Sequence, residues 1–158
     1  QWQGRRNIES FGHDIEASWL LHETALVLAD KEVLAWIEPV VKRVATAADE
    51  GLLADGSMVY ERWNDTDTTD RSLQWWVQCE NVIGHVNLWQ HFGTAPDLAI
   101  AERCWNYIKT HLVDDKNGEW YWSINADGTI NRQDDKAGFW KCPYHNTRMC
   151  LEIMERDF

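Results

Sequence analysis

The sequence lacks any apolar run close to the ~18 to 20 residues that a membrane-spanning helix needs. Its N-terminal residues also lack the positively charged region and apolar stretch that together mark a secretory signal peptide. We therefore expect a cytoplasmic protein without a membrane partner. The chain begins Gln-Trp-Gln rather than with Met, so we expect it to be a piece of a longer protein whose N-terminal part is missing.

Positive charge is also scarce. The chain has 15 Lys and Arg against 26 Asp and Glu, which gives a net charge of −11. An acidic surface repels phosphate backbones and anionic lipids, so nucleic acid and membrane surfaces are excluded as partners. The hydrophobic fraction of 44% is nevertheless that of an ordinary globular protein. We expect one domain with a sizeable core.

Metal-binding and disulfide patterns are absent as well. The four cysteines form no CxxC pair, and the six histidines form neither HxxxH nor HExxH. Metal sites need ligands at such short spacings, so we expect no metal ion. The scattered cysteines favour free thiols in a reducing compartment. These are Cys79, Cys104, Cys142 and Cys150.

Tryptophan, in contrast, is abundant, with 11 residues in 158. An indole offers a broad apolar face with one N–H donor, which suits the C–H faces of a sugar ring. Trp36, Trp89 and Trp105 fall inside helical patterns and are expected to fill the core. Core packing and ligand stacking both remain open for the tryptophans near loops. These are Trp75, Trp76, Trp120, Trp122 and Trp140.

Helical periodicity dominates the chain and predicts an all-α fold with short strands in the loops. Pro39 is expected to kink or split the second of the helices. The predicted strands span residues 58–63 and 119–124, and polar loops span 64–70 and 131–138. The predicted helices span residues 14–28, 31–49, 72–91, 96–113 and 144–155.

A repeat organises these elements. Residues 51–76 and 118–140 share one order: a turn with glycine, a short strand, an acidic loop, and a tryptophan-bearing segment that enters a helix. Such a period is typical of stacked helical hairpins, which curve and can close into an α/α toroid. Every second helix then points its N-terminus to the same rim. Three segments, 13–16, 75–80 and 140–148, are therefore expected to converge on one pocket.

The converging segments carry acid–base residues. His13 and His145 each stand at or near the start of a predicted helix, and imidazole changes charge near neutral pH. Either histidine alone fits a structural role equally well. Together, on opposite faces of a substrate carbon, one imidazole can remove a proton beside a carbonyl and the other can return one. Glu16 can orient an imidazole or bind a hydroxyl, and Arg148 is a candidate donor to the enediolate oxygens.

Four motifs in this order resemble the N-acylglucosamine 2-epimerase superfamily, and most closely its cellobiose 2-epimerase branch. They are SFGHDIEASWLL, QWWVQCENVIG, GEWYWSI and KAGFWKCPYHNTRMCLE. The resemblance implies that residues 1–158 form the C-terminal part of a single (α/α)6 barrel catalytic domain, with the N-terminal part missing. It also implies an isomerase that reversibly epimerises C2 of the reducing-end glucose in β-1,4-linked disaccharides such as cellobiose, through an enediolate. No metal or organic cofactor is implied.

The resemblance also assigns residues. His13 of GHDIE and His145 of PYHN would be the catalytic acid–base pair. Trp76 and Trp140 would stack on the sugar rings. The remaining expected substrate-binding residues are Glu16, Glu80 and Arg148. The family uses further residues from its N-terminal helices, which this chain does not contain, so the chain alone is expected to be incomplete as a catalyst.

Other functions remain open. Within the superfamily, the same enediolate also serves an aldose–ketose isomerase or a monosaccharide 2-epimerase acting on mannose or N-acylglucosamine. A glycoside hydrolase on an α/α toroid needs two carboxylates beside the scissile bond, and Asp65, Asp67 and Asp70 lie in a loop where solvation is the simpler explanation. A non-catalytic carbohydrate-binding fragment would use the aromatic side chains alone.

Overall fold

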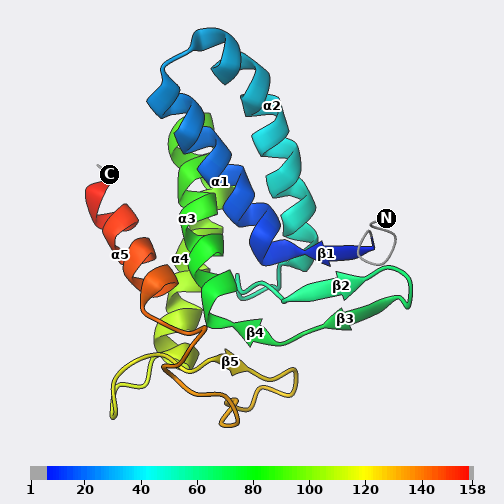
Figure 1. Cartoon of the computed structure of the whole chain (residues 1–158), viewed down its shortest axis with the longest axis vertical. Helices are drawn as coiled ribbons and strands as arrows, with labels where there is room; N and C mark the ends of the chain where they lie inside the picture. The colour runs from blue at the N-terminus through cyan, green and yellow to red at the C-terminus, as the bar shows by residue number, and fades with distance from the viewer. Residues whose placement is uncertain (1–6, 157–158) are drawn as a thin grey trace.

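Five α-helices make up most of the computed structural model, which describes residues 7–156 (Figure 1). A 3-10 turn, Asp49–Gly51, follows the second helix, and a π-helical turn, Ile108–Leu112, follows the fourth. The helices are α1 (Phe11–Leu28), α2 (Lys31–Ala48), α3 (Trp75–Phe92), α4 (Ala95–Tyr107) and α5 (Tyr144–Glu155). The all-α class with short strands in the loops is thus confirmed.

The helices form two hairpins and a fifth helix beside them. α1 packs against α2 and α3 against α4, while α1, α3 and α5 lie side by side with their N-termini at the same end (Figure 1). Ala29, with φ of 53°, ends α1, and the Asp30 carboxylate caps α2 by accepting hydrogen bonds from two backbone N–H groups. The predicted common rim is therefore present.

α3 is the central helix of the described structure. Every residue from Trp75 to Leu88 is buried, because α1, α4 and α5 all pack against this helix. Gly84 permits the close approach of α1, since a Cβ atom there would lie 2.4 Å from Cγ1 of Ile15. A helix buried on all sides shows no polar face, and its polar residues then need internal partners.

Short β-strands lie at the rim, next to the N-termini of α1 and α3. β1 (Ile8–Ser10), β2 (Glu61–Trp63) and β3 (Thr68–Asp70) form an antiparallel sheet in that order. β4 (Leu73–Gln74) pairs with β5 (Ser123–Ile124) in a second sheet. Because β1 leads directly into α1 and β4 into α3, the two sheets fix where these helices begin.

Several predicted boundaries were wrong. α1 begins at Phe11 instead of residue 14, directly after β1, so His13 lies inside the first helical turn. α3 begins at Trp75 instead of residue 72, because the preceding residues pair with β5. The observed strands β2 and β5 are shorter than the predicted ones, and part of the predicted polar loop 64–70 forms β3. These helix and strand boundaries are set by strand pairing between segments that lie far apart in the sequence.

Of the two alternatives expected for Pro39, a kink or a split of α2, the split was wrong. Pro39 lies inside α2, which runs as one helix from Lys31 to Ala48. Proline removes one helical hydrogen bond, but Ile37, Val41 and Ala45 bury their side chains beside it. This burial outweighs the lost bond. Between residues 7 and 156, none of the helices has the length and apolar character to cross a membrane.

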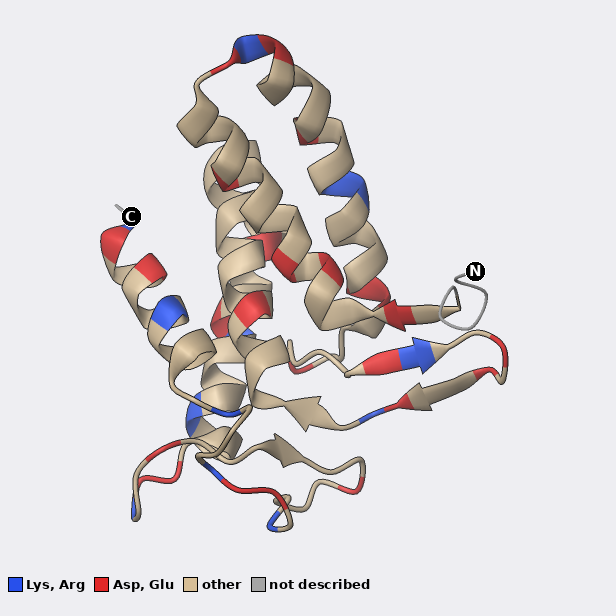
Figure 2. Cartoon of the chain, in the orientation of Figure 1, with Lys and Arg blue, Asp and Glu red and all other residues tan. Residues whose placement is uncertain are grey.

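Charge is spread over residues 7–156 without a basic region. Figure 2 shows Asp and Glu on helices, strands and loops, with short stretches of Lys and Arg between them. Several acidic side chains pair with these basic residues, as in the Arg62–Glu50 and Arg156–Glu23 ion pairs. The remaining unpaired carboxylates contribute to the net charge of −11.

Candidate functional site

A hollow opens at the rim where α1, α3 and α5 begin. Its volume is about 590 Å³, within the range of small-molecule sites. Aromatic rings form most of its wall, with polar groups between them. The lining residues are His13, Glu16, Tyr60, Gln74, Trp75, Trp76, Trp122, Trp140, Tyr144 and His145. The three segments predicted to converge therefore do converge on one hollow.

Trp76 contacts both of the histidines that were predicted to act as a pair. Its ring centroid is 4.7 Å from that of His13 and 5.6 Å from that of His145. The position of the indole depends on Gly12, because a Cβ atom there would lie 2.7 Å from the Trp76 ring. A glycine directly before His13 thus lets the start of α1 pack against the indole of α3.

His145 is oriented from behind by a buried carboxylate. Its Nδ1 atom lies 2.7 Å from Oε1 of Glu80, whose side chain is 0% exposed. The same carboxylate accepts hydrogen bonds from Arg148 Nη2 at 2.7 Å and from Trp19 Nε1 at 3.0 Å. Because Glu80 is the acceptor for these donors, Nδ1 of His145 donates to it. The Nε2 atom is then the basic nitrogen available on the ring.

Arg148 is held between two carboxylates. Its Nη2 atom lies 2.5 Å from Oε1 of Glu16 and 2.7 Å from Oε1 of Glu80. Burial disfavours the charged guanidinium, but the hydrogen bonds to Glu16 and Glu80 outweigh burial and raise the pKa of Arg148 further above its ordinary value. The guanidinium also stacks on Trp19 and Tyr144. Arg148 therefore locks the start of α5 to α1 and α3.

His13 has a different environment. Its side chain is exposed, and its Nδ1 atom lies 2.7 Å from Oγ of Ser10, the residue that precedes α1. Asp14 follows it, and burial raises the pKa of this carboxyl group, although the neighbouring His13 opposes the change. One imidazole of the hollow thus contacts a hydroxyl and the other a buried carboxylate, so the two have unequal surroundings.

The carboxylates and His145 also have the geometry of a metal site. Ligand atoms of Glu16, Glu80 and His145 lie within 4.8 Å of one another, the one such group within residues 7–156. However, Nη2 of Arg148 contacts both carboxylates. A divalent cation at this position would face the guanidinium charge at contact distance. The donor set therefore fits an internal ion pair better than a metal ion.

The structure separates the predicted site residues into three groups. His13, Glu16, Trp76 and His145 line the hollow, and Trp140 lies at its edge with 78% of its surface exposed. Glu80 and Arg148 lie behind the wall and are occupied by internal partners. A direct contact of either with substrate was predicted, and their placement favours a supporting position instead.

Sequence reasoning missed several residues of this region. Trp19 was assigned no contact, although it lies three residues after Glu16 and thus on the same face of α1. Tyr60 and Gln74 gave no signal, because the residues between β1 and α3 reach the hollow only through pairing of strands distant in the chain. Trp75 and Trp122, left open before, pack on each other with centroids 4.8 Å apart.

Known proteins match this chain over nearly its whole length. It is 56% identical to the cellobiose 2-epimerase of Bacteroides fragilis over 153 residues, covering 97% of this chain and 39% of that protein. The crystal structure of a sugar epimerase from a ruminal bacterium superimposes with a TM-score of 0.88 at 35% identity, over 96% of this chain and 39% of that one. The cellobiose 2-epimerase of Bacillus thermoamylovorans gives a TM-score of 0.85 at 39% identity, over 96% of this chain and 38% of that one.

These comparisons identify both the fold and the family of the chain. These structural neighbours have (α/α)6 barrels, so the helical hairpins described above are those of such a barrel. The chain spans about 39% of the length of the Bacteroides relative that it matches. A profile of the N-acylglucosamine 2-epimerase (GlcNAc 2-epimerase) family covers residues 3–148, and the chain therefore belongs to this family.

Proposed function

We propose that the complete protein containing this chain is a sugar 2-epimerase that inverts C2 of the reducing-end glucose in β-1,4-linked disaccharides such as cellobiose. One observation carries the proposal: the imidazoles of His13 and His145 both contact the Trp76 indole and both line one hollow. The names of the relatives support the substrate class.

The reaction needs two acid–base groups and no redox partner. After the sugar ring opens, one imidazole takes the proton from C2, and the C–H electron pair forms the C1–C2 double bond of an enediolate. The other histidine, as imidazolium, gives a proton to the opposite face of C2, and the carbonyl re-forms. His145, whose Nδ1 atom donates to Glu80, presents Nε2 for one of these transfers, and His13 serves the other.

The enediolate needs hydrogen-bond donors at its oxygens. Arg148 was a candidate, but its guanidinium is engaged by Glu16 and Glu80. We therefore propose that the donor comes from the part of the protein outside this chain. Glu80 and Arg148 then act by holding His145, while Glu16, which lines the hollow, binds a substrate hydroxyl.

Stacking on tryptophan provides the sugar affinity in this proposal. Trp76 lines the hollow in contact with both histidines, and the exposed indole of Trp140 lines the same hollow. Sugar C–H faces pack on indole rings, so the two rings would each receive one unit of a disaccharide. Neither a metal ion nor an organic cofactor is needed for these steps.

We propose that residues 1–158 form the C-terminal part of one barrel domain. The relatives are longer than this chain, and the chain leaves apolar surfaces for other helices to cover. One is a groove of about 560 Å³ between α3, α4 and α5, lined by Trp105, Ile153 and Met154 among others. We also propose a cytoplasmic location, which the four free cysteines support.

The test is to incubate the complete protein with cellobiose and identify the products by NMR. We expect 4-O-glucosyl-mannose in reversible equilibrium with cellobiose. Glucosyl-fructose as the main product would indicate an aldose–ketose isomerase, and free glucose would indicate a hydrolase. Binding without any product would reduce the chain to a carbohydrate-binding role. Each of these three outcomes would overturn the proposal.

A further inference from the structure

The segment between β5 and α5 determines where α5 begins, and therefore where His145 lies in the hollow. Most of residues 125–140 are exposed, so apolar burial contributes little to fixing this segment. The residue before α5, Pro143, provides no side-chain hydrogen bond to cap the helix. Other contacts must therefore define where α5 begins and how His145 faces Glu80.

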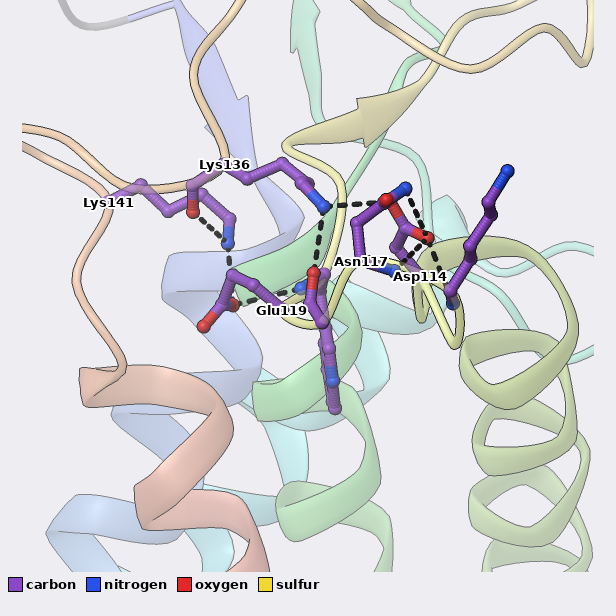
Figure 3. Close-up of polar contacts among 8 residues, drawn as sticks. Asp114, Asn117, Glu119, Lys136 and Lys141 are labelled. Carbon is purple, nitrogen blue, oxygen red and sulfur yellow. Dashed lines mark hydrogen bonds and ion pairs between the residues drawn. The ribbon is translucent and has the colours of Figure 1, made fainter.

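Two polar clusters hold this segment (Figure 3). The outer clasp consists of Asp114, Asn117 and Lys136: Nζ of Lys136 lies 2.7 Å from Oδ2 of Asp114, and Asn117 donates to the same carboxylate. The inner clasp consists of Glu119, Lys141 and Asn146. Only the inner clasp has a member on α5, because Asn146 belongs to the first turn of that helix.

Glu119 is the centre of the inner clasp. Its Oε1 atom accepts hydrogen bonds from Lys141 Nζ at 2.9 Å, Asn146 Nδ2 at 3.0 Å and its neighbour's backbone N–H at 3.0 Å. Its backbone has φ of 63°, a left-handed conformation that costs a non-glycine residue about 1 kcal/mol. A glutamate at such a position indicates that the carboxylate is needed there.

Lys141 is buried, with only 1% of its side chain exposed. Burying an ammonium group costs free energy unless hydrogen-bond acceptors and a negative charge compensate it. Its Nζ atom meets Oε1 of Glu119, the carbonyl oxygen of Lys136 at 2.8 Å, and the Trp75 ring, whose centroid is 5.2 Å away. The Trp75 ring in turn meets the His145 ring edge-on at a centroid distance of 6.3 Å.

These contacts lie close to His145, both along the chain and through the Trp75 ring. Asn146 follows it in the chain, Lys141 precedes it by four residues, and Trp75 contacts both the ammonium group and the imidazole. We propose that Glu119, Lys141 and Asn146 are positioning residues that set the orientation of the His145 imidazole for proton transfer. This inference rests on the proposed function.

The test compares three variants of the complete protein. Lys141→Met removes the buried ammonium group of the inner clasp, and Glu119→Gln removes the negative charge that pairs with it, both with little change of volume. Lys136→Met breaks the outer clasp in the same segment, keeps the Lys136 carbonyl, and contacts no part of α5 in the described structure. We expect the inner-clasp variants to lose about 10- to 100-fold in kcat, with KM nearly unchanged because the tryptophans stay in place. Lys136→Met should keep kcat within about twofold.

Two further readouts separate positioning from loss of folding. A Glu119→Gln/Lys141→Met double variant should lose no more kcat than the worse single variant, since both break one unit. NMR of 15N-labelled histidine should show an altered Nδ1–H resonance of His145 in Lys141→Met and an unaltered one in Lys136→Met. If Lys141→Met does not fold, Glu119→Gln carries the same test.

The inference is overturned if the inner-clasp variants keep wild-type kcat, or if Lys136→Met loses as much. An unaltered His145 resonance in Lys141→Met and Glu119→Gln also overturns it. This NMR readout does not depend on turnover, so it still tests the inference if the wild-type protein fails to epimerise cellobiose. Failure of the proposed function and failure of this inference are thereby distinguished.

Discussion

The Nδ1 atom of His145 lies 2.7 Å from Oε1 of Glu80, although 65 residues separate the two in the chain. This contact joins α5 to the buried centre of α3 and fixes the tautomer of the imidazole. Trp19 and Arg148 donate to the same carboxylate, so three helices meet at one acidic side chain. Stability and the proposed chemistry depend on the same residue here.

Replacement of Glu80 should therefore affect both properties. In Glu80→Gln, the partly buried guanidinium of Arg148 keeps only Glu16 as a charged partner. We expect the free energy of unfolding to fall by about 1–3 kcal/mol, as for other buried polar groups left with an unsuitable partner. Glu16→Gln, at a partly exposed side chain, should cost less. Denaturant unfolding of both variants measures the difference, and equal losses would contradict the central place of Glu80.

Gly12 offers a test of the Trp76 position. In Gly12→Ala the new Cβ would lie 2.7 Å from both the Trp76 ring and Cγ2 of Val77, so the indole must move. Overpacking of this kind costs about 1–3 kcal/mol, and we expect KM for the disaccharide to rise about tenfold. Gly138→Ala is the control, since its Cβ would meet its nearest neighbour, Cβ of Asp135, at an ordinary 3.8 Å. Unchanged KM in Gly12→Ala would show that the indole does not hold the sugar.

Chelation tests the nature of the Glu16, Glu80 and His145 cluster. Because Arg148 supplies the positive charge between the two carboxylates, we expect dialysis against EDTA to leave turnover unchanged. Added Zn²⁺ should not increase it. Loss of turnover in EDTA, with recovery on adding a divalent metal ion, would show instead that the cluster holds a metal.

Acid should weaken the two clasps. Hydrogen bonds from Lys136 and Asn117 hold the pKa of Asp114 well below its ordinary value. For Glu119, burial raises the pKa, but the Lys141 hydrogen bond and the other donors outweigh it, so this pKa is also lowered. A lowered folded-state pKa stabilises the fold at pH above the unfolded value of about 4, and this contribution disappears as pH falls through the folded-state pKa.

The measurement is Tm of the complete protein between pH 7 and pH 3, for the wild type and for Asp114→Asn. Asp114→Asn should have the lower Tm at neutral pH, and the two values should approach each other as the pH falls below about 4. A difference in Tm that stays constant over the whole range would show that the Asp114 charge does not contribute.

Local signals were sufficient to predict much of this fold. The bounds of α5 were predicted correctly, because Pro143 and the apolar periodicity mark that helix within the sequence itself. The beginning of α3 was missed because it depends on the pairing of Leu73–Gln74 with Ser123–Ile124, which lie 50 residues further along. Helix periodicity carries no information on such pairing.

The same limit applies to the site. The spacing of His13, Trp76 and His145 in the sequence was enough to predict that they lie at one rim, because helical hairpins repeat at a regular length. The burial of Glu80 beneath His145 and the three donors around Glu119 depend on tertiary neighbours from several segments. In the sequence, Glu80 and Glu119 look like any other acidic residues. Only the structure shows that other side chains of the protein donate hydrogen bonds to their carboxylates.

Proton exchange at C2 tests the paired histidines most directly. The complete protein, together with His13→Asn and His145→Asn variants, would be incubated with cellobiose in D2O, and deuterium at C2 of the glucosyl-mannose product followed by NMR. We expect deuterium at C2 with the wild type, and a loss of at least about 100-fold in the rate of product formation in each variant, with cellobiose binding retained. Turnover at the wild-type rate in either variant, or product without deuterium, would contradict proton transfer between these histidines and C2.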